Sequence, residues 1–352
     1  MTSLDPERLD QLVNKMVGDM GAAVNGALVV LGDRLGLFRA LAGMNDASPA
    51  DLAAAAGVSE RYTREWLGGM AAQGYVTPDA TASRFHLTPE QAAVFADRES
   101  PVLLTGGYES IGAIYGDLGR LESAFAAGSG VGWGEHNTCL FCGTEKFFKP
   151  NYKAHLVAEW LPALEGVTEK LADGGRVADV GCGHGASTLL MAQAYPNSTF
   201  TGYDFHAPSV ETARARAAEA GLTNVHFEQC AAREVPDGGY DLVCFFDALH
   251  DMGDPEGALR RMREVVKPDG TVMLVEPMAG DTAAENMNPV GAVYYGFSTS
   301  VCVPCSLAQE GGAALGAQAG EARLREVAER AGFNHWRRAA ETPLNLVLEA
   351  RP

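Results

Sequence analysis

A glycine-rich loop between a short apolar strand and a helix constrains this fold more than any other feature of the chain. Residues 177–185 read Val-Ala-Asp-Val-Gly-Cys-Gly-His-Gly, and a helical run follows at 186–194. Glycine permits the positive φ of a tight turn and lets a ligand approach the backbone closely. This strand–loop–helix order is typical of the corner of a doubly wound α/β sheet that binds phosphates or nucleosides. We therefore expect an α/β fold of that kind.

Asp179, two residues before the loop, indicates which ligand the loop binds. The spacing is Gly-x-Gly-x-Gly, not the dinucleotide-binding Gly-x-Gly-x-x-Gly, and no P-loop Lys-Ser or Lys-Thr pair follows. A carboxylate here repels a pyrophosphate but attracts an ammonium group. Asp204 ends the next β-rich run, about 20 residues after the loop, where ribose hydroxyls bind in such folds. S-adenosylmethionine, with a cationic amino-acid end and no phosphate, fits this pattern.

The chain after residue 165 alternates apolar strands with amphipathic helices. The expected strands are 177–180, 199–203, 225–228, 240–246, 271–276, 335–340 and 344–350. The link between the last two is too short for a parallel crossover, so these two strands form an antiparallel pair. Residues 166–352 thus predict a doubly wound, seven-stranded sheet that is mostly parallel and has one antiparallel edge strand.

Residues 1–95 predict a helical domain that ends in a winged helix, with a wing formed by 75–77 and 84–88. This segment has seven Lys or Arg against eleven Asp or Glu, a net charge of −4, which disfavours nucleic acid as a partner. An apolar stripe with helical spacing precedes the winged helix and suggests a homodimer interface. The stripe comprises Val13, Met16, Met20, Val24, Leu28 and Leu31.

Two further segments have features expected of a substrate pocket. Residues 96–165 form a helical bridge rich in aromatic side chains, which either pack in a core or line the pocket. Residues 281–319 are too long for an ordinary connection. Since S-adenosylmethionine is a methyl donor, we expect this segment to form a lid over the molecule that accepts the methyl group. Tyr294, Tyr295 and Phe297 in that segment favour a small apolar or aromatic acceptor, although they could also be packing residues.

Composition limits the location and the partners of the chain. The 352 residues carry a net charge of −18, which argues against an anionic polymer as partner. The first residues lack a basic segment followed by an apolar one, and we find no run of 18 uncharged apolar residues, so we expect neither export nor membrane insertion. Seven irregularly spaced cysteines then suggest reduced thiols in the cytoplasm.

His250 is the best candidate for a general base. Methyl transfer to a hydroxyl requires removal of a proton, and imidazole, with an ordinary pKa of about 6.5, suits that task. His250 follows the expected strand 240–246, at the sheet edge where ligands bind in such folds. Glu276 ends the expected neighbouring strand 271–276. Its carboxylate would hold one ring nitrogen and stabilise the imidazolium.

These motifs resemble those of the class I S-adenosylmethionine-dependent methyltransferases. Residues 249–254 (Leu-His-Asp-Met-Gly-Asp), followed by a helix, Lys-Pro-Asp-Gly and a strand that ends in Glu, are similar to the catalytic stretch of small-molecule O-methyltransferases. That stretch has Trp where this chain has Met252. The whole chain resembles actinobacterial methyltransferases fused to a winged-helix dimerisation domain.

The resemblance implies roles for individual residues. His250 would be the base and Glu276 its partner. The remaining implied contacts are to the cofactor: Gly181 and Gly183 beneath the methionine moiety, Phe205 on adenine, Cys230 and Ala231 at the adenine edge, and the Phe246 backbone facing the amino group. Phe205 could equally be a core residue.

Several alternatives stay open at this point. The acceptor atom could be nitrogen, sulfur or carbon, in which case His250 would position the acceptor, or the chain could be a cofactor-sensing DNA regulator without catalysis. Two Cys-x-x-Cys pairs, Cys139 with Cys142 and Cys302 with Cys305, could form a zinc or soft-ligand site. Both pairs lie in apolar segments, so we expect buried structural thiols and no metal.

Overall fold

The computed structural model describes residues 4–352 and contains two compact units. The first unit comprises Met1–Tyr115 and Thr138–Pro150, and the second comprises Gly116–Asn137 and Asn151–Pro352. The segment 96–165 is therefore shared between the units. The division into 1–95, 96–165 and 166–352 remains a prediction.

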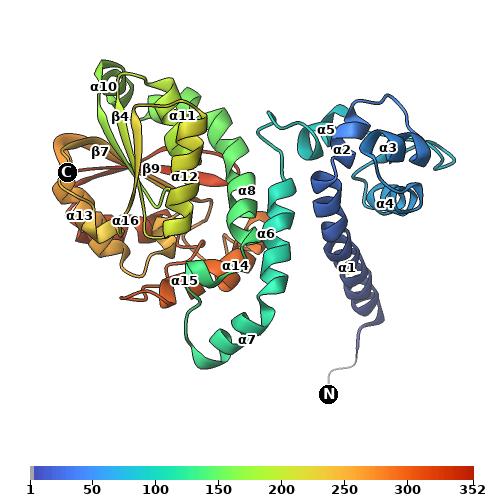
Figure 1. Cartoon of the computed structure of the whole chain (residues 1–352). Coiled ribbons are helices and arrows are strands. Elements are labelled where there is room, and N and C mark those ends of the chain that lie inside the picture. The colour runs from blue at the N-terminus through green and yellow to red at the C-terminus, as the bar shows by residue number, and fades with distance from the viewer. Residues whose placement is uncertain (1–3) are drawn as a thin grey trace. The chain divides into compact units, whose positions relative to one another are not determined.

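The second unit is built on a seven-stranded sheet in the order β5-β4-β3-β6-β7-β9-β8 (Figure 1). The strands are β3 (Arg176–Val180), β4 (Thr199–Asp204), β5 (Val225–Gln229), β6 (Tyr240–Phe246), β7 (Val266–Pro277), β8 (His335–Glu341) and β9 (Asn345–Arg351). The predicted doubly wound sheet is confirmed, including the antiparallel pairing of the last two strands. The strand that runs against the others is β9, which lies second from the edge because it pairs with both β7 and β8.

Helices cover both faces of this sheet. The helices of the unit are α7 (Leu118–Ala127), η1 (Trp133–Glu135), η2 (Leu156–Trp160), α9 (Leu161–Ala163), α10 (Val167–Asp173), α11 (Ala186–Ala194), α12 (Ala207–Glu219), η3 (Ala232–Glu234), η4 (Leu249–Asp251), α13 (Pro255–Val265), α14 (Pro289–Phe297), η5 (Ser298–Cys302), α15 (Val303–Leu307) and α16 (Gly320–Arg330). The strand order runs outward from β3 to β5 in one direction and from β6 to β7 in the other. Because such crossovers are right-handed, α11 and α12 cover one face and α13 the other.

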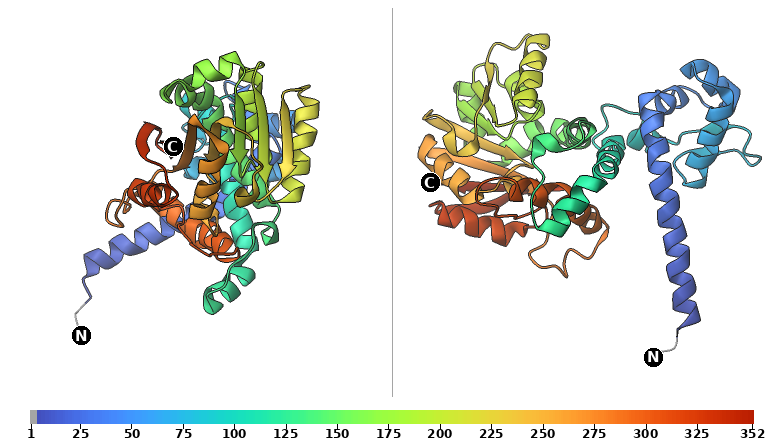
Figure 2. Two further views of the ribbon diagram at one scale, coloured as in Figure 1. Left: turned by 90° about the vertical axis from the view of Figure 1, so that its left-hand side faces the viewer. Right: turned by 60° about the horizontal axis from the view of Figure 1, so that its bottom comes forward.

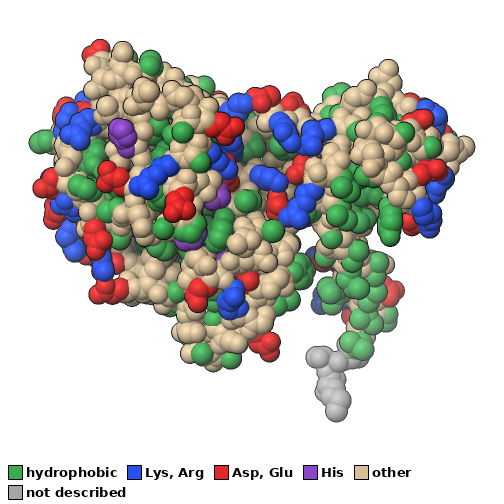
Figure 3. All heavy atoms as spheres, in the orientation of Figure 1, with side chains coloured by type: hydrophobic (Ala, Val, Ile, Leu, Met, Phe, Trp, Pro, Cys, Tyr) green, Lys and Arg blue, Asp and Glu red, His purple; other side chains and the backbone are tan. Residues whose placement is uncertain are grey.

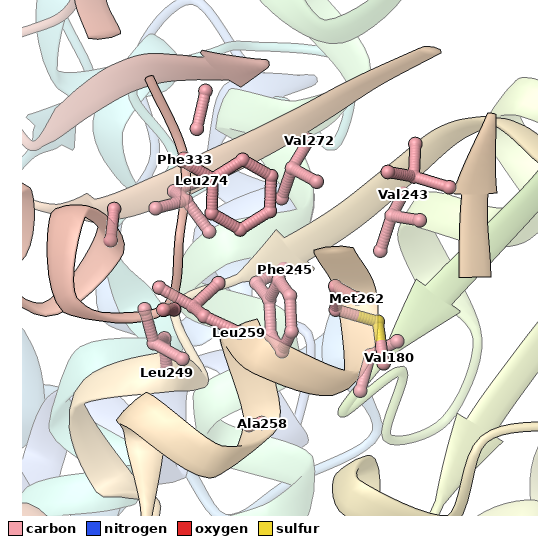
Figure 4. Packing of buried hydrophobic residues seen from close by; sticks show 14 of the residues in the cluster. Val180, Val243, Phe245, Leu249, Ala258, Leu259, Met262, Val272, Leu274 and Phe333 are labelled. Carbon is pink, nitrogen blue, oxygen red and sulfur yellow. The ribbon is translucent and has the colours of Figure 1, made fainter. Parts of the chain in front are cut away.

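The core between the sheet, α13 and α16 follows the two-residue period of the strands (Figure 4). Val243 and Phe245 of β6 and Val272 and Leu274 of β7 point to this face. The residues between them face the α11 side instead. In β3, Ala178 and Val180 face the core, so Asp179 faces α11, which explains how an acidic residue can lie in a strand that is otherwise apolar.

The first unit is helical and carries a small wing. Its elements are α1 (Pro6–Arg34), α2 (Leu37–Ala42), α3 (Pro49–Ala56), α4 (Glu60–Ala72), β1 (Thr77–Pro78), β2 (Phe85–His86) and α5 (Pro89–Phe95), with most of α6 (Thr105–Gly116) and α8 (Cys139–His155). The predicted wing is present, though its paired strands are only two residues long. Figure 2 shows α1 as one long helix, which ends where Gly36 adopts a φ of +73°.

The core of this unit is aromatic. Phe38 stacks on Phe95 and meets Trp66 edge-on, each at 4.9 Å between ring centroids. The indole nitrogen of Trp66 donates a hydrogen bond to the Leu28 carbonyl at 2.8 Å, which ties α4 to α1. Trp66 thus supplies both apolar contact area and a fixed hydrogen bond between the two helices.

The predicted lid segment contains a continuous helical run, Pro289–Leu307. Its mean hydropathy of 1.2 and its 19 residues satisfy the length and composition of a membrane-spanning helix, contrary to our expectation from the sequence. A single run of this kind is weak evidence for a membrane span. Buried helices of soluble proteins also satisfy the criterion, and 44% of its most apolar window is buried inside the protein.

Two glycines of α1 provide a matched test of the packing around Trp66. A Cβ on Gly32 would lie 2.6 Å from the Trp66 ring and 2.7 Å from the Phe38 ring, whereas a Cβ on Gly18 meets nothing within 4 Å. We expect Gly32→Ala to lower the free energy of unfolding by about 1–3 kcal/mol through overpacking. Gly18→Ala should raise it by up to about 1 kcal/mol through helix propensity. Urea unfolding followed by tryptophan fluorescence measures both, and equal effects would contradict the packing.

Candidate active site

The glycine loop lies where the strand order of the sheet reverses, between β3 and β6. Gly181, Gly183 and Gly185 all have positive φ, of +75°, +52° and +79°. A Cβ on Gly181 would lie 2.7 Å from the Cβ of Ala248, so the loops after β3 and β6 approach as closely as a glycine allows. A Cβ on Gly183 would meet nothing within 4 Å, so space is open beside that residue. Ligands of open α/β sheets bind at this switch point.

Asp179 is buried beneath the loop and only half of its carboxylate is satisfied. The hydroxyls of Ser187 and Thr188, at the start of α11, donate to Oδ2 at 2.7 and 2.6 Å. Oδ1 is buried and has no hydrogen-bond partner among the described residues. Burial raises the pKa of Asp179 to about 6. An unpaired carboxylate oxygen costs free energy that a cationic ligand would offset.

Asp204 holds the loop through its carboxylate. Its oxygens accept backbone hydrogen bonds from Gly183 and His206, both at 2.8 Å, and burial raises its pKa. The next residue, Phe205, is 49% exposed, so it is not a core residue. Cys230, at the end of the neighbouring strand β5, donates its N–H to the Asp204 carbonyl at 2.9 Å. Cys230 therefore lies beside Asp204, and the contact of Cys230 and Ala231 with adenine stays a prediction.

His250 and Glu276 meet at the ends of β6 and β7. The Nδ1 atom of His250 lies 2.5 Å from Oε2 of Glu276, and the Leu249 N–H donates to the other carboxylate oxygen at 3.1 Å. Both side chains are buried, at 5% and 1% exposure. Since a carboxylate only accepts, Nδ1 carries a proton. The Nε2 atom is therefore the one available for acid–base work.

Asp251 occupies the other side of the His250 ring. Its Oδ1 atom lies 3.1 Å from Nε2. Burial disfavours the imidazolium, but the negative charges of Asp251 and Glu276 outweigh burial and raise the pKa of His250 well above its ordinary value. In this arrangement the ring is held protonated, and an acceptor would have to replace Asp251 at Nε2 before His250 could remove a proton.

Sequence reasoning missed a buried carboxyl group that interacts electrostatically with His250. Asp247, with a φ of +49°, directly follows β6. Its oxygens accept hydrogen bonds from the Tyr152 hydroxyl at 2.5 Å and the Asn345 amide at 2.8 Å. Burial raises the pKa of Asp247 to about 8. Its position at the end of a fully buried strand was a signal, but its partners are far away in the sequence.

The predicted Phe246 lies between the sheet and this network. Its side chain is buried, and its ring packs against that of Tyr152 at 5.3 Å between centroids. Tyr152 belongs to the aromatic bridge, where the sequence left core packing and pocket lining equally open. It is 6% exposed and hydrogen-bonded to Asp247, so it buttresses the end of β6.

The four cysteines of the two Cys-x-x-Cys pairs form no disulfide within the described residues and have different surroundings. Cys139 and Cys142 lie in the first unit, on α8, and Cys142 is exposed. Cys302 and Cys305 are buried in the second unit. Cys305 lies 3.5 Å from Nε2 of His136, and Cys302 belongs to a cluster with His250 and Asp251.

Comparison with known proteins identifies both parts of the chain. Residues 171–332 match the model of a methyltransferase domain, and residues 23–97 match an Rv2258c-like winged helix-turn-helix domain. The ubiquinone biosynthesis O-methyltransferase of Bordetella avium is 35% identical over 133 residues, which is 36% of this chain and 52% of the relative. The 27-O-demethylrifamycin SV methyltransferase of Amycolatopsis mediterranei is 33% identical over 147 residues, 36% of this chain and 54% of the relative. The chain thus spans about half the length of these curated relatives.

Solved structures share the fold over nearly the whole chain. Human N-acetylserotonin methyltransferase, crystallised with SAM, has a TM-score of 0.71 at 17% identity and covers 100% of this chain and 99% of its own. An O-methyltransferase family protein from Burkholderia thailandensis has a TM-score of 0.68 at 17% identity, with 99% of each chain covered. By the two family models, the chain contains a methyltransferase domain at residues 171–332 and an N-terminal winged helix-turn-helix domain of the Rv2258c-like type at residues 23–97.

Proposed function

We propose that this chain transfers the methyl group of S-adenosylmethionine to a hydroxyl oxygen of a small organic acceptor. The proposal is carried by the 2.5 Å contact of His250 with Glu276 at the sheet edge that also bears the glycine loop. A histidine oriented by a buried carboxylate is an arrangement suited to taking a proton from a hydroxyl. The names of both curated relatives, which describe O-methylation, agree with this acceptor atom.

The loop after β3 has the features that this cofactor requires. The Oδ1 atom of Asp179, which has no hydrogen-bond partner in the described part of the chain, suits the cofactor's ammonium group. The open space beside Gly183 lets the methionine moiety of the cofactor lie against the backbone of the loop. We assign Asp204 to the ribose, the exposed ring of Phe205 to adenine, and Cys230 and Ala231 to the adenine edge. The Phe246 backbone and Gly181 would border the amino-acid end. The cofactor supplies a methyl group on a sulfonium, which departs as a neutral thioether.

His250 then acts on the acceptor. Glu276 holds Nδ1–H and stabilises the imidazolium, so Nε2 receives the proton of the acceptor hydroxyl. That hydroxyl takes the place of Asp251, whose side chain lies on a short turn and is 23% exposed. We infer an apolar or aromatic acceptor, since Tyr295 and Phe297 of the predicted lid are partly exposed whereas Tyr294 is buried and bonded to the Leu344 carbonyl.

Nucleic acid is not among the partners we infer. The helix α4, which would be the recognition helix of the winged domain, carries two arginines. Arg61 is paired with Glu65 and Arg64 with Glu60, each at 2.5 Å. Binding to DNA depends on free basic groups that neutralise phosphates, and these two ion pairs oppose it. We therefore favour the enzyme over the DNA regulator.

A second copy of this chain is the partner we infer for α1. Its apolar side chains lie in the open, as the hydrophobic band along this helix in Figure 3 illustrates. The band includes Leu12 (57% exposed), Val13 (50%), Met16 (51%), Val17 (63%), Met20 (62%) and Val24 (70%). A continuous exposed apolar stripe of this kind marks an interaction surface.

A cytoplasmic location fits the thiols of the chain. None of the seven cysteines, all of which lie in the described residues, forms a disulfide. Chains in oxidising compartments more often carry disulfides, so free thiols favour a reducing compartment.

Replacing His250 distinguishes methyl transfer to oxygen from methyl transfer to nitrogen, sulfur or carbon. We expect His250→Ala to lower kcat for a phenolic acceptor by about 10²–10⁴-fold while affinity for S-adenosylhomocysteine is retained. Because the pKa of His250 is raised, the rate of the wild-type protein should increase with pH in a range well above the ordinary pKa of histidine. Asp251→Asn removes one of the charges that raise this pKa, so the increase should move to lower pH. His335→Ala, at an exposed histidine of β8, is the control. A loss below tenfold for His250→Ala would favour a positioning role and hence a nitrogen, sulfur or carbon acceptor.

The ionisation of Asp179 should govern affinity for the cofactor's amino-acid end. A bound cation favours the carboxylate, so S-adenosylhomocysteine should bind more tightly as the pH rises and level off above about 6. Calorimetric titration between about pH 5 and about pH 8 measures this effect. 5′-Methylthioadenosine lacks the ammonium group and should not show it, and Asp179→Asn should abolish it. The same slope for both ligands would refute the assignment.

The dimer is tested by placing charge in the apolar stripe. Met16→Glu combined with Met20→Glu should halve the mass measured by light scattering after size-exclusion chromatography, because buried unpaired carboxylates oppose association. Lys15→Ala, on the same helix but outside the stripe, should leave the mass unchanged. A monomeric wild-type protein would rule out the dimer.

A further inference from the structure

Three side chains with metal-binding atoms converge next to the proposed base. The Nε2 atom of His250, a carboxylate oxygen of Asp251 and Sγ of Cys302 all lie within 4.8 Å of one another. His250 and Cys302 are 4% and 6% exposed. They come from different parts of the fold: His250 and Asp251 from η4 after β6, and Cys302 from the last position of η5. The η5 turn is π-helical, a distortion that often accompanies functional sites.

The three atoms that meet here can each bind a cation through an electron pair. Glu276 holds the proton on Nδ1, so Nε2 presents its lone pair to an ion once its own proton has left. The Oδ1 atom of Asp251 faces that lone pair at 3.1 Å, and this oxygen is buried without a hydrogen-bond partner among the described residues. A proton or a metal ion between Nε2 and this oxygen removes the repulsion between their electron pairs.

We propose that His250, Asp251 and Cys302 bind a divalent cation of the zinc class. Imidazole nitrogen, carboxylate oxygen and thiolate sulfur are the zinc ligands found in proteins, at about 2.0–2.3 Å from the ion. Ligands around a tetrahedral ion at those distances lie about 3–4 Å from one another, so small side-chain shifts within the 4.8 Å cluster suffice.

The surroundings of the cluster match those of a metal site. Glu276 on the remote nitrogen of His250 gives the carboxylate–histidine–metal arrangement that orients metal-binding histidines. Three protein ligands leave a fourth position for water or another small ligand. Binding of the ion displaces the thiol proton of Cys302 and the Nε2 proton of His250, and both protons are released to solvent. The site departs from our expectation of no metal, and it uses one cysteine with His250 rather than four cysteines.

The ion would change what His250 does, and this step rests on the proposed function. The Nε2 lone pair can bind a metal or accept the acceptor's proton, but it cannot do both. A bound ion therefore inhibits methyl transfer to oxygen, and its removal restores the base.

Cobalt binding tests the site without reference to activity. Co²⁺ titrated into full-length protein freed of metal by a chelator should give one equivalent of visible d–d bands and a near-ultraviolet thiolate-to-cobalt band. Cys302→Ser should lose the thiolate band, and His250→Ala should weaken binding at least tenfold. Cys305→Ser is the matched control, because Cys305 is buried one turn away and faces His136 instead. It should behave as wild type.

The outcomes separate this site from the proposed function. A wild-type protein without the thiolate band, or a band that survives in Cys302→Ser, would overturn the metal site. If the bands behave as expected, zinc should inhibit methyl transfer reversibly in wild type and not in Cys302→Ser. Equal inhibition of both would refute the competition at Nε2. A normal cobalt spectrum in a protein that transfers no methyl group to any hydroxyl would refute the proposed function and leave the metal site intact.

Discussion

The close approach of the loops after β3 and β6 is the constraint on which the site depends. A Cβ on Gly181 would lie only 2.7 Å from that of Ala248, so any other residue would push the loops apart. The glycine loop brings the buried Asp179 to this junction, and the other loop places His250 against Glu276. Parallel pairing of β3 with β6, and of β6 with β7, sets the register of both loops. Sheet pairing and one missing side chain thus determine the distance between the glycine loop and His250.

The carboxyl edge of this sheet concentrates buried carboxyl groups. Asp179, Asp204 and Asp247 all have raised pKa values because burial disfavours their ionised forms. Each is partly compensated in its own way, by hydroxyls, by backbone N–H groups, or by a tyrosine and an asparagine. A ligand with positive charge stabilises the ionised forms of these carboxyl groups, whereas a phosphate would disfavour them further. The same argument that identified Asp179 in the sequence therefore extends over the whole edge.

Sequence patterns predicted what depends on local periodicity and failed for contacts between distant segments. All seven strands were found because apolar runs and turn residues mark them, and Asp179, His250 and Glu276 stood at predicted strand ends. Tyr152 and Asn345 carry no such mark: they reach Asp247 across 95 and 98 residues. The position of β9, second from the sheet edge, could not be predicted either, because the sequence of a strand does not show which strands it pairs with. Cys302 was noticed in the sequence, but its proximity to His250 and Asp251 could not be predicted. Cys302 lies at the end of a π-helical turn, and no sequence pattern shows that this turn packs near η4.

The position of Asp251 makes His250 a group with two competing uses. With a proton on Nε2, the ring is an imidazolium between two carboxylates, a stable ion cluster that cannot accept a further proton. Without that proton, the lone pair lies against an unpartnered carboxylate oxygen, which is unfavourable until an acceptor hydroxyl or a metal ion enters. A histidine oriented in this way therefore needs a third partner at Nε2, either a hydroxyl or a metal ion, when that nitrogen carries no proton. Buried charge that serves only folding would have been paired off, whereas here one oxygen stays unpaired beside the reactive nitrogen.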